Sequence, residues 1–289
     1  MRYQQLRRGA DSHLVAETNG THYDLTAAKP ELEGFRDLAR SASVADASID
    51  ALAADVLDDA PEIDAGDVAS DRDLPVVPEE VWAAGVTYQI SEQARQAESD
   101  TPDMYVDVYD AERPEVFFKA TPSRTVGPNE DVGVRADSEW NVPEPELGIV
   151  LYRGDVVGYT IGNDVSSRDI EGENPLYLPQ AKVYDRCCSI GPCIVSTGDI
   201  PDPHDLSMSM SVTRDGAEIY ADETSTIEMV RTCEELADYY TRHNAVPELA
   251  VLLTGTSIVP DEGFDLTAGD VVSIDIEGIG TLTNGVRTV

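Results

Sequence analysis

Short apolar runs with the two-residue period of β-strands recur along this chain, and Gly, Asp and Pro separate them. Runs of this kind predict strands bounded by turns. From residue 115 onward they follow one another closely, at residues 116–120, 146–152, 156–161, 193–196, 207–214 and 271–276. An earlier apolar run at 81–87 predicts one more buried strand.

Helical spacing of apolar residues is confined to a few segments. It predicts helices at residues 29–40, 43–57, 91–99, 227–240 and 248–253. Because these helices do not alternate with the strands, the pattern disfavours a doubly wound parallel sheet. It predicts instead an α+β fold in which strands dominate.

The chain divides into a small first part and a large second part. Residues 1–73 combine two short predicted strands, at 2–7 and 14–15, with the first two helices, which predicts a small N-terminal α+β domain. Residues 61–75 are acidic and interrupted by Pro and Gly, as is typical of a linker. Residues 74–289 carry the β-rich pattern and predict one larger domain.

The charge of the chain is strongly negative, with 20 basic against 56 acidic residues and a formal net charge of −36. Hydrophobic residues make up 41%, so the chain still has enough of them for a sizeable core. The acidic residues are spread along the whole length, which is typical of a surface that stays hydrated in concentrated salt. We therefore expect a halophilic protein. Nucleic acid is disfavoured as a partner, because no basic stripe is present to neutralise phosphates.

Several sequence features indicate the cellular compartment in which the protein works, and they favour the cytoplasm. No apolar run is long enough for a transmembrane helix, and the first residues lack the apolar stretch of a signal peptide. The four cysteines include the neighbours Cys187 and Cys188, which cannot form an ordinary disulfide, and none has the spacing of a zinc site. We expect a cytoplasmic protein that binds no membrane.

Three carboxylates are predicted to meet on one face of a β-hairpin. Glu144 and Glu146 are two residues apart, so an extended strand places both on the same side. Residues 146–164 predict two strands joined by a turn at 153–155, and a three-residue turn there brings position 144 opposite Asp164. Three hard oxygen ligands at one point suit Mg²⁺, Mn²⁺ or Ca²⁺. In a chain this acidic, a Glu-x-Glu pair also fits a solvated strand face.

Lysine is rare in this chain. Of the 20 basic residues, only Lys29, Lys119 and Lys182 are lysines. A lysine that is partly buried beside a bound cation can act as a base or proton shuttle. This makes Lys182 the candidate for catalysis. Lys119 fits a structural ion pair or a contact of the site equally well. Arg168 fits an ion pair with Asp169 or a supporting role beside the site.

Several motifs occur in the order and spacing of one known family. They are Phe-Lys-Ala-Thr-Pro-Ser-Arg-Thr-Val-Gly-Pro at 118–128, Glu-Pro-Glu-Leu-Gly at 144–148, Gly-Tyr-Thr-Ile-Gly-Asn-Asp-Val-Ser-Ser-Arg-Asp at 158–169, Lys182, and Leu-Thr-Gly-Thr at 253–256. With them, residues 80–289 resemble the fumarylacetoacetate hydrolase family. The resemblance implies a mixed β-sandwich roll that holds one divalent metal ion, and assembly into homodimers or homotetramers.

The resemblance also implies roles for residues at matching positions. Glu144, Glu146 and Asp164 match the family's metal ligands. Lys182 matches its catalytic lysine, and Thr256 matches the threonine that meets the substrate carboxylate. Members of the family act on 2-oxo acids that chelate the metal through carboxylate and keto oxygens. Chelation makes the protons on the neighbouring carbon acidic, because the metal stabilises the enolate oxygen.

One departure from the family's motifs bears on whether the reaction is a hydrolysis or an elimination. The carbon–carbon hydrolases carry a His and a Glu after an Asn-Tyr pair, and these two residues activate water. Here Tyr88 aligns with the tyrosine, but Ser91 and Ala94 stand at the His and Glu positions. Without this dyad, cleavage of a carbon–carbon bond by water lacks its base, which argues against a hydrolase.

The remaining motifs resemble the sugar-acid dehydratase branch of the family, with Gly-Val-Thr-Tyr at 85–88 and related segments at 113–121 and 179–182. Such enzymes convert a 2-keto-3-deoxy-pentonate (xylonate or arabinonate) to 2,5-dioxopentanoate, which requires a base at C3 and an acid at C4. We expect Lys182 to transfer the proton at C3. Glu115 is either its partner or a plain charged residue beside a strand. The expected substrate contacts are Tyr88, Lys119, Arg168 and Thr256.

Two other functions stay open at this point. The same site fits acylpyruvate hydrolysis or oxaloacetate decarboxylation, since both also begin from a metal-held enolate. From a different class, an acidic protein that binds cations without catalysing a reaction fits the same composition. In each enzymatic case the partner is a small 2-oxo acid and the expected cofactor is Mg²⁺, with Mn²⁺ or Ca²⁺ as substitutes.

Overall fold

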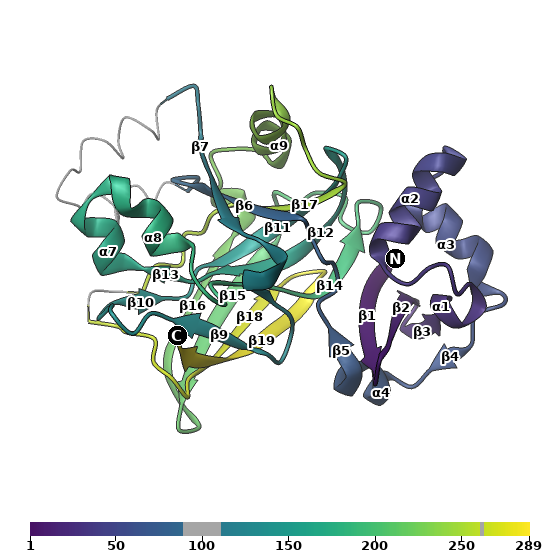
Figure 1. Cartoon of the computed structure of the whole chain (residues 1–289), viewed down its shortest axis with the longest axis horizontal. Coiled ribbons are helices and arrows are strands. Elements are labelled where there is room, and N and C mark those ends of the chain that lie inside the picture. The colour runs from purple at the N-terminus through teal and green to yellow at the C-terminus, as the bar shows by residue number, and fades with distance from the viewer. Residues whose placement is uncertain (89–110, 261–262) are drawn as a thin grey trace.

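A mixed β-sheet of 12 strands runs through the part of the chain that the structure describes, which comprises residues 1–88, 111–260 and 263–289. The structure is a computed structural model (Figure 1). The strand order is β4-β3-β2-β1-β14-β12-β11-β17-β6-β7, with β5 paired to β1 and β8 paired to β14. The strands are β1 (Arg2–Arg8), β2 (Asp11–Thr18), β3 (Thr21–Asp24), β4 (Glu62–Ile63), β5 (Arg72–Asp73), β6 (Glu80–Gly85), β7 (Glu115–Ala120), β8 (Thr125–Val126), β11 (Pro145–Tyr152), β12 (Asp155–Asp164), β14 (Cys188–Ser196) and β17 (Leu249–Leu253).

A second sheet of five strands, in the order β16-β15-β18-β19-β9, shares an apolar core with the first. Leu147 and Ile161 from the first sheet belong to this core together with Met208 and Ile274 from the second. Two sheets that bury their facing side chains form a β-sandwich. The strands are β9 (Asp131–Val134), β15 (Ser207–Arg214), β16 (Ala217–Ser225), β18 (Val271–Ile276) and β19 (Gly280–Thr288), and a separate pair is formed by β10 (Asn141–Val142) and β13 (Ser166–Ser167).

Helices lie around the outside of the sheets (Figure 1). This arrangement confirms the prediction of a β-dominated α+β fold, and the two packed sheets agree with the sandwich that the resemblance implied. Within the described residues, none of the helices has the length and apolar character needed to cross a membrane. The helices are α1 (Leu25–Ala28), α2 (Phe35–Ala45), α3 (Ile49–Leu57), α4 (Ala65–Asp71), α7 (Arg168–Glu173), α8 (Leu178–Lys182) and α9 (Cys233–Thr241).

Three of the five predicted helices are found, with different limits. The first begins only at Phe35 and continues to Ala45, and the second begins at Ile49, because Asp46 adopts a left-handed conformation that ends α2. The segment predicted at 227–240 contains a short 3-10 turn followed by α9. The helix predicted at 91–99 lies outside the described residues.

The N-terminal segment shares a sheet and a core with the rest of the chain. β1 pairs antiparallel with β14, and Tyr3 and Phe35 belong to the same apolar core as Leu249 of β17. We propose a domain boundary near residue 74, because β5 ends just before it and the next strand, β6, pairs with β17 and β7 and with no other strand of the described ranges.

Residues 61–75 form β4, α4 and β5, so the prediction of a linker is wrong. Asp64 caps α4 by accepting a hydrogen bond from the N–H of Gly66 at 2.8 Å. Val68 is buried against Leu6 and Val15. The acidic residues that suggested a linker are instead the capping and solvent-facing positions of a short amphipathic helix.

The predicted helix at 248–253 is also wrong, because most of this segment is the central strand β17. All five residues of β17 are buried. The strand pairs antiparallel with β11 and parallel with β6, so neighbours flank it on both sides. A strand buried on both faces is a continuous apolar run, which periodicity cannot distinguish from part of a buried helix.

The hairpin of β11 and β12 reaches its predicted register by a different turn. Tyr152 pairs with Asp155, which leaves a two-residue turn instead of the expected three-residue turn. A β-bulge at Val157 adds one residue to β12 and restores the register. The N–H of Asp164 donates to the carbonyl oxygen of Glu144 at 2.9 Å. The predicted pairing of these two positions is therefore confirmed, although the turn length is wrong.

Glu248 forms an ion cluster that links α2 to the hairpin turn. Its carboxylate accepts hydrogen bonds from Arg40 at 3.1 Å, Arg153 at 3.0 Å and the Tyr152 hydroxyl at 3.2 Å. Hydrogen bonding from Arg40 is the main reason that the pKa of Glu248 falls from 4.5 to about 2. The ionised carboxylate therefore adds stability above pH 4.5, and this contribution is lost as the pH falls toward 2.

Glu248→Gln is expected to lower the free energy of unfolding by about 1 kcal/mol at neutral pH, because water and salt weaken a cluster this close to the surface. The difference from wild type should shrink at acid pH, where the wild-type carboxylate is protonated as well. Urea unfolding at neutral and acid pH measures both values. Glu218→Gln, on exposed β16, is the control. A difference that does not change with pH would contradict the expectation.

Candidate active site

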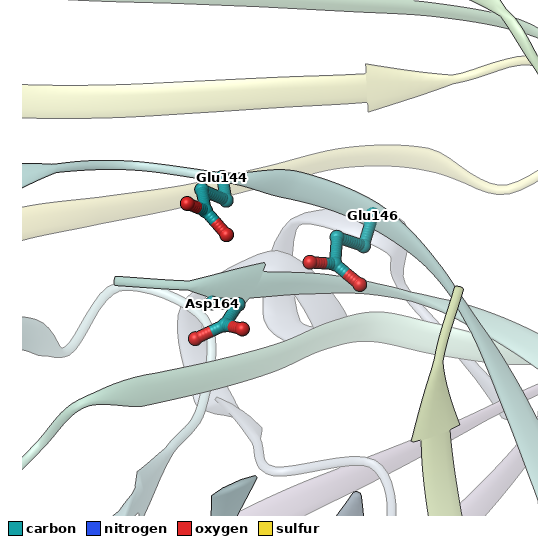
Figure 2. A group of neighbouring side chains, drawn as sticks. All are labelled: Glu144, Glu146 and Asp164. Atoms are coloured by element: carbon teal, nitrogen blue, oxygen red, sulfur yellow. The ribbon is translucent and has the colours of Figure 1, made fainter. Parts of the chain in front are cut away.

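Three carboxylates face a common space at one end of the β11–β12 hairpin. Glu144 immediately precedes β11, Glu146 lies within it, and Asp164 is the last residue of β12. One carboxylate oxygen from each residue lies within 4.8 Å of the other two, and Figure 2 shows how the side chains gather. Their exposed fractions are 3%, 1% and 0%. The structure thus brings together the three residues that the sequence placed on one face.

Lys182 inserts its ammonium among these carboxylates. It is the last residue of α8 and is 1% exposed. Its Nζ donates to Glu144 Oε2 at 2.6 Å, to Asp164 Oδ2 at 3.2 Å and to Ser166 Oγ at 2.7 Å. Ser166 was not predicted as a site residue, because neither its residue type nor its spacing distinguishes a serine that supports a buried lysine.

Two more buried cations surround the cluster. Arg168, at the start of α7, lies 2.7 Å from Glu144 Oε1 and 3.5 Å from Glu171 Oε2. Lys119, in β7, lies 2.5 Å from Asp164 Oδ1. The role of Glu171 was also missed, although its position three residues after Arg168 in a helix was an available signal.

Among the described residues, those at the core of the site carry more negative than positive charge. Glu144, Glu146, Asp164 and Glu171 are opposed by Lys119, Arg168 and Lys182, all of them buried. Burial, followed by the charges of the other two carboxylates of the cluster, raises the pKa of Glu146 well above its usual range. Burial opposes the charged form of Lys119, but the charge of Asp164 and smaller contributions from Cys187, Tyr184 and Cys188 together outweigh it and raise that pKa. An added cation would relieve this excess of negative charge.

The donor set fits a divalent cation that prefers oxygen ligands. Three carboxylates converge within reach of one ion, and Mg²⁺ is commonly held by a few carboxylates together with water or substrate oxygens. The excess of negative charge and the raised pKa of Glu146 both indicate that the cluster is built for a positive charge. The carboxylates also line a small cavity of about 20 Å³ together with Lys182 and Arg168.

The loops after two parallel strands, β17 and β6, support the cluster. The N–H of Gly255 donates to Glu146 Oε2 at 2.5 Å. The hydroxyl of Thr87 donates to the carbonyl oxygen of Thr254 at 2.6 Å and so joins the two loops. Thr256 follows directly and lines the cavity, as its predicted contact with substrate requires. Gly255 was not singled out from the sequence, although it lies within the Leu-Thr-Gly-Thr motif.

Gly255→Ala is expected to cost about 3 kcal/mol of stability and to weaken metal binding. A methyl group there would collide with Thr87 Oγ1 and lie 2.9 Å from the carbonyl oxygen of Ala84, and the backbone is left-handed with φ +84°. Gly269→Ala is the matched control, because φ is +95° and no atom lies within 4 Å, so it isolates the backbone cost of about 1 kcal/mol. Urea unfolding and metal titration measure both effects. Equal losses in the two variants would contradict the expectation.

The other predicted residues lie near the cavity without all lining it. Glu115 begins β7, and its carboxylate lies so close to Gly85 that a Cβ there would collide with it. Gly85 lines the cavity, whereas Glu115, Tyr88 and Lys119 are not among the described residues that do. Tyr88 is fully buried, and burial raises its pKa. The positions of Ser91 and Ala94 lie outside the described residues.

Comparisons with known proteins agree with this geometry. Residues 80–287 match the fumarylacetoacetate (FAA) hydrolase C-terminal family. A probable 2-keto-3-deoxyxylonate dehydratase from Haloferax volcanii is 65% identical over 289 residues, the full length of both chains. A 2-dehydro-3-deoxy-D-arabinonate dehydratase from Saccharolobus solfataricus is 44% identical over 218 residues, which are 74% of this chain and 73% of the relative.

A solved structure extends the similarity from sequence to fold. It is the 2-keto-3-deoxy-D-arabinonate dehydratase complexed with magnesium and 2,5-dioxopentanoate, with a TM-score of 0.86 and 36% identity over 100% of this chain and 99% of that chain. The family match includes the carboxylate cluster, Lys182 and the loop with Thr256. The chain therefore belongs to the fumarylacetoacetate hydrolase family.

Proposed function

We propose that this protein is a metal-dependent dehydratase, a hydro-lyase that converts a 2-keto-3-deoxy-pentonate (xylonate or arabinonate) into 2,5-dioxopentanoate. The observation that carries the proposal is the 65% identity to a probable 2-keto-3-deoxyxylonate dehydratase over the full length of both chains. The site geometry alone fits any reaction of a 2-oxo acid that begins with loss of a proton beside the keto group. The full-length match favours dehydration among these reactions.

Glu144, Glu146 and Asp164 would hold the metal ion. Mg²⁺ is the expected ion, since the similar dehydratase structure contains magnesium, and Mn²⁺ and Ca²⁺ share its preference for oxygen ligands. When bound, the ion supplies Lewis-acid stabilisation of the negative charge that develops on the keto oxygen.

Lys182 is the residue that we assign to proton transfer at C3. It lines the cavity and contacts two of the three carboxylates of the cluster. Ser166 holds the ammonium from a further direction at 2.7 Å. A side chain held in this way is oriented before the substrate arrives, which lowers the entropic cost of reaching the reactive geometry.

Arg168 and Thr256 are the candidates for binding the carboxylate of a 2-oxo acid, because both line the cavity and carry donors. Arg168 is positioned by its ion pairs with Glu144 and Glu171. Thr256 Oγ1 accepts a hydrogen bond from the N–H of Ile258 at 3.1 Å, so its own hydrogen is available to an acceptor in the cavity.

The proposed reaction removes one water without an external reactant. The C3–H bond breaks and its proton passes to Lys182, which acts here in its neutral amine form, while the C4 hydroxyl takes up a proton and leaves as water, which forms a C3–C4 double bond. A proton then moves from C5 to C3, and the resulting enol at C5 becomes the aldehyde of 2,5-dioxopentanoate. Glu115, whose carboxylate lies against Gly85 at the cavity wall, is the candidate acid for the C4 hydroxyl.

A product assay in high salt tests the proposal. The deoxy sugar acid should give 2,5-dioxopentanoate in the presence of Mg²⁺, and EDTA should abolish the reaction. Because the product has no stereocentre, both C4 epimers can be compared in one assay. Faster turnover of oxaloacetate or an acylpyruvate would contradict the dehydratase assignment. Metal binding without turnover of any 2-oxo acid would instead indicate a non-enzymatic cation-binding protein.

We further propose that the protein works in a halophilic cytoplasm as a homodimer or homotetramer. The excess of 56 acidic over 20 basic residues supports the first part. The four cysteines are free and buried, which suits a reducing compartment. Light scattering in molar KCl measures the mass of the assembly, and a monomer at working concentration would contradict the proposed oligomer.

A further inference from the structure

Two of the three lysines of this chain share one carboxylate. Lys182 Nζ lies 3.2 Å from Asp164 Oδ2, and Lys119 Nζ lies 2.5 Å from Oδ1 of the same residue. The third lysine, Lys29, is exposed at the end of α1. In a chain where arginine supplies the other 17 basic residues, this arrangement indicates that Asp164 needs a lysine at each oxygen.

The ammonium of Lys119 lies among three oxygen atoms of the protein. Besides its ion pair with Asp164 Oδ1 at 2.5 Å, it donates to the carbonyl oxygen of Val165 at 2.9 Å and to the carbonyl oxygen of Lys182. Two of its three N–H donors are thus used by main-chain carbonyl groups, and its charge is paired with Asp164. The side chain is completely buried, and Lys119 is not among the described residues that line the cavity. Lys119 therefore lies behind the cavity wall rather than at the surface that a substrate would meet.

The three oxygen atoms around the Lys119 ammonium belong to three segments that build the site. Asp164 ends β12, Val165 joins β12 to β13, and Lys182 ends α8. Carbonyl groups at the end of a helix lack partners within the helix, and a cation there is favourable. One ammonium thus fixes both the direction of the Asp164 carboxylate and the position of the Lys182 main chain.

Lysine suits this place better than arginine does. Its ammonium is a compact charge, which fits among three oxygen atoms around one point, whereas guanidinium is planar and spreads its donors in a fork. The ring of Tyr184 lies 5.7 Å from Lys119 Nζ, and the Tyr184 hydroxyl donates to the carbonyl oxygen of Val165 at 3.0 Å. This packing gives a physical reason for a buried lysine in a chain that otherwise uses arginine.

We propose that Lys119 is a positioning residue, which holds the Asp164 carboxylate and Lys182 in one arrangement from outside the cavity and does not bind substrate. The inference rests on the proposed function for the roles of Asp164 as metal ligand and Lys182 as proton carrier. The inference adds that metal affinity and turnover depend on Lys119, although this side chain contacts neither the metal nor the substrate.

Lys119→Met tests this, because it keeps most of the side-chain volume and removes the charge and all three donors. We expect about 10- to 100-fold weaker Mn²⁺ binding, measured by electron paramagnetic resonance. At saturating metal, kcat should fall by a similar factor with little change in KM. Lys29→Met is the matched control and should equal wild type in every measurement.

Two other results would overturn the proposal. Loss of a substrate contact would raise KM and leave Mn²⁺ affinity at the wild-type value. A merely structural role would lower the melting temperature and leave Mn²⁺ affinity and kcat of the folded protein unchanged.

A second variant keeps the test decisive if Lys119→Met does not fold. The single change removes one of the two lysines that pair with the buried Asp164 and leaves Lys182 as the other, which is destabilising. Lys119→Met combined with Asp164→Asn removes both charges and should raise the melting temperature above that of the single variant. A double variant no more stable than Lys119→Met overturns the proposal. Because melting temperature and Mn²⁺ affinity are measured without turnover, failure of the dehydratase assay would not be mistaken for failure of this inference.

Discussion

Lys182→Met is expected to lower kcat for a 2-keto-3-deoxy-pentonate by about 10³-fold, since positioned general acid–base groups contribute on the order of 10²- to 10⁴-fold. The reason is that Lys182 combines contact with the carboxylate cluster and a place in the cavity wall. Product formation gives the overall loss. Exchange of the C3 proton for deuterium, followed by nuclear magnetic resonance, measures proton removal separately from loss of the C4 hydroxyl.

The exchange experiment also identifies what would contradict the assignment. If Lys182→Met still exchanges the C3 proton at the wild-type rate, another group is the base and Lys182 acts later in the reaction. Lys29→Met controls for the loss of a lysine elsewhere, since that side chain is exposed. Mn²⁺ titration of the variant shows whether the carboxylate cluster is still able to hold metal.

The centre of the site could be predicted from the sequence because it is built locally. Glu146 and Asp164 belong to the two strands of one hairpin and Glu144 immediately precedes the first strand, so extended-strand geometry places them on one face. The predicted strand register is correct although the predicted turn length is wrong, because the bulge at Val157 adds the residue that the shorter turn lacks. Side-chain alternation fixes which face a residue occupies, whereas a bulge leaves no clear signal in a single sequence.

The supporting contacts could not be predicted, because they come from segments far apart in the chain. The partners of Lys119 depend on where α8 ends relative to β7, and nothing local in the sequence determines that distance. From the sequence alone, a structural ion pair and a contact of the site were therefore equally good interpretations of Lys119. The support of Glu146 by Gly255 likewise depends on the pairing of β17 with β11.

The errors in the fold have a similar origin. β17 was interpreted as a helix because all five of its residues are buried, so the strand has no polar face. β16 and β19 were not predicted, because one is largely exposed and the other carries Gly and Thr in place of a strong apolar alternation. Both are stabilised by pairing with β15 and β18, which is a property of the sheet rather than of their own residues.

Glu146→Gln is expected to separate metal binding from stability. The variant should bind Mg²⁺ about 100-fold more weakly and lose dehydratase activity accordingly, because an amide oxygen offers the ion no negative charge. The melting temperature of wild type should rise on addition of Mg²⁺, since an ion that binds only the folded state stabilises it. The variant should show little of this rise. Glu218→Gln, on exposed β16, should behave as wild type.

In EDTA, the Glu146→Gln variant should be at least as stable as the wild type. Burial and the charges of Asp164 and Glu144 disfavour the ionised form of Glu146, as its raised pKa indicates. Glutamine removes that repulsion and keeps an oxygen that accepts the N–H of Gly255. A variant much less stable than metal-free wild type would show that the carboxylate serves the fold. Undiminished Mg²⁺ affinity would exclude Glu146 as a ligand. Weak Mg²⁺ binding with retained stability is the result expected if the negative charge of Glu146 serves to bind a cation.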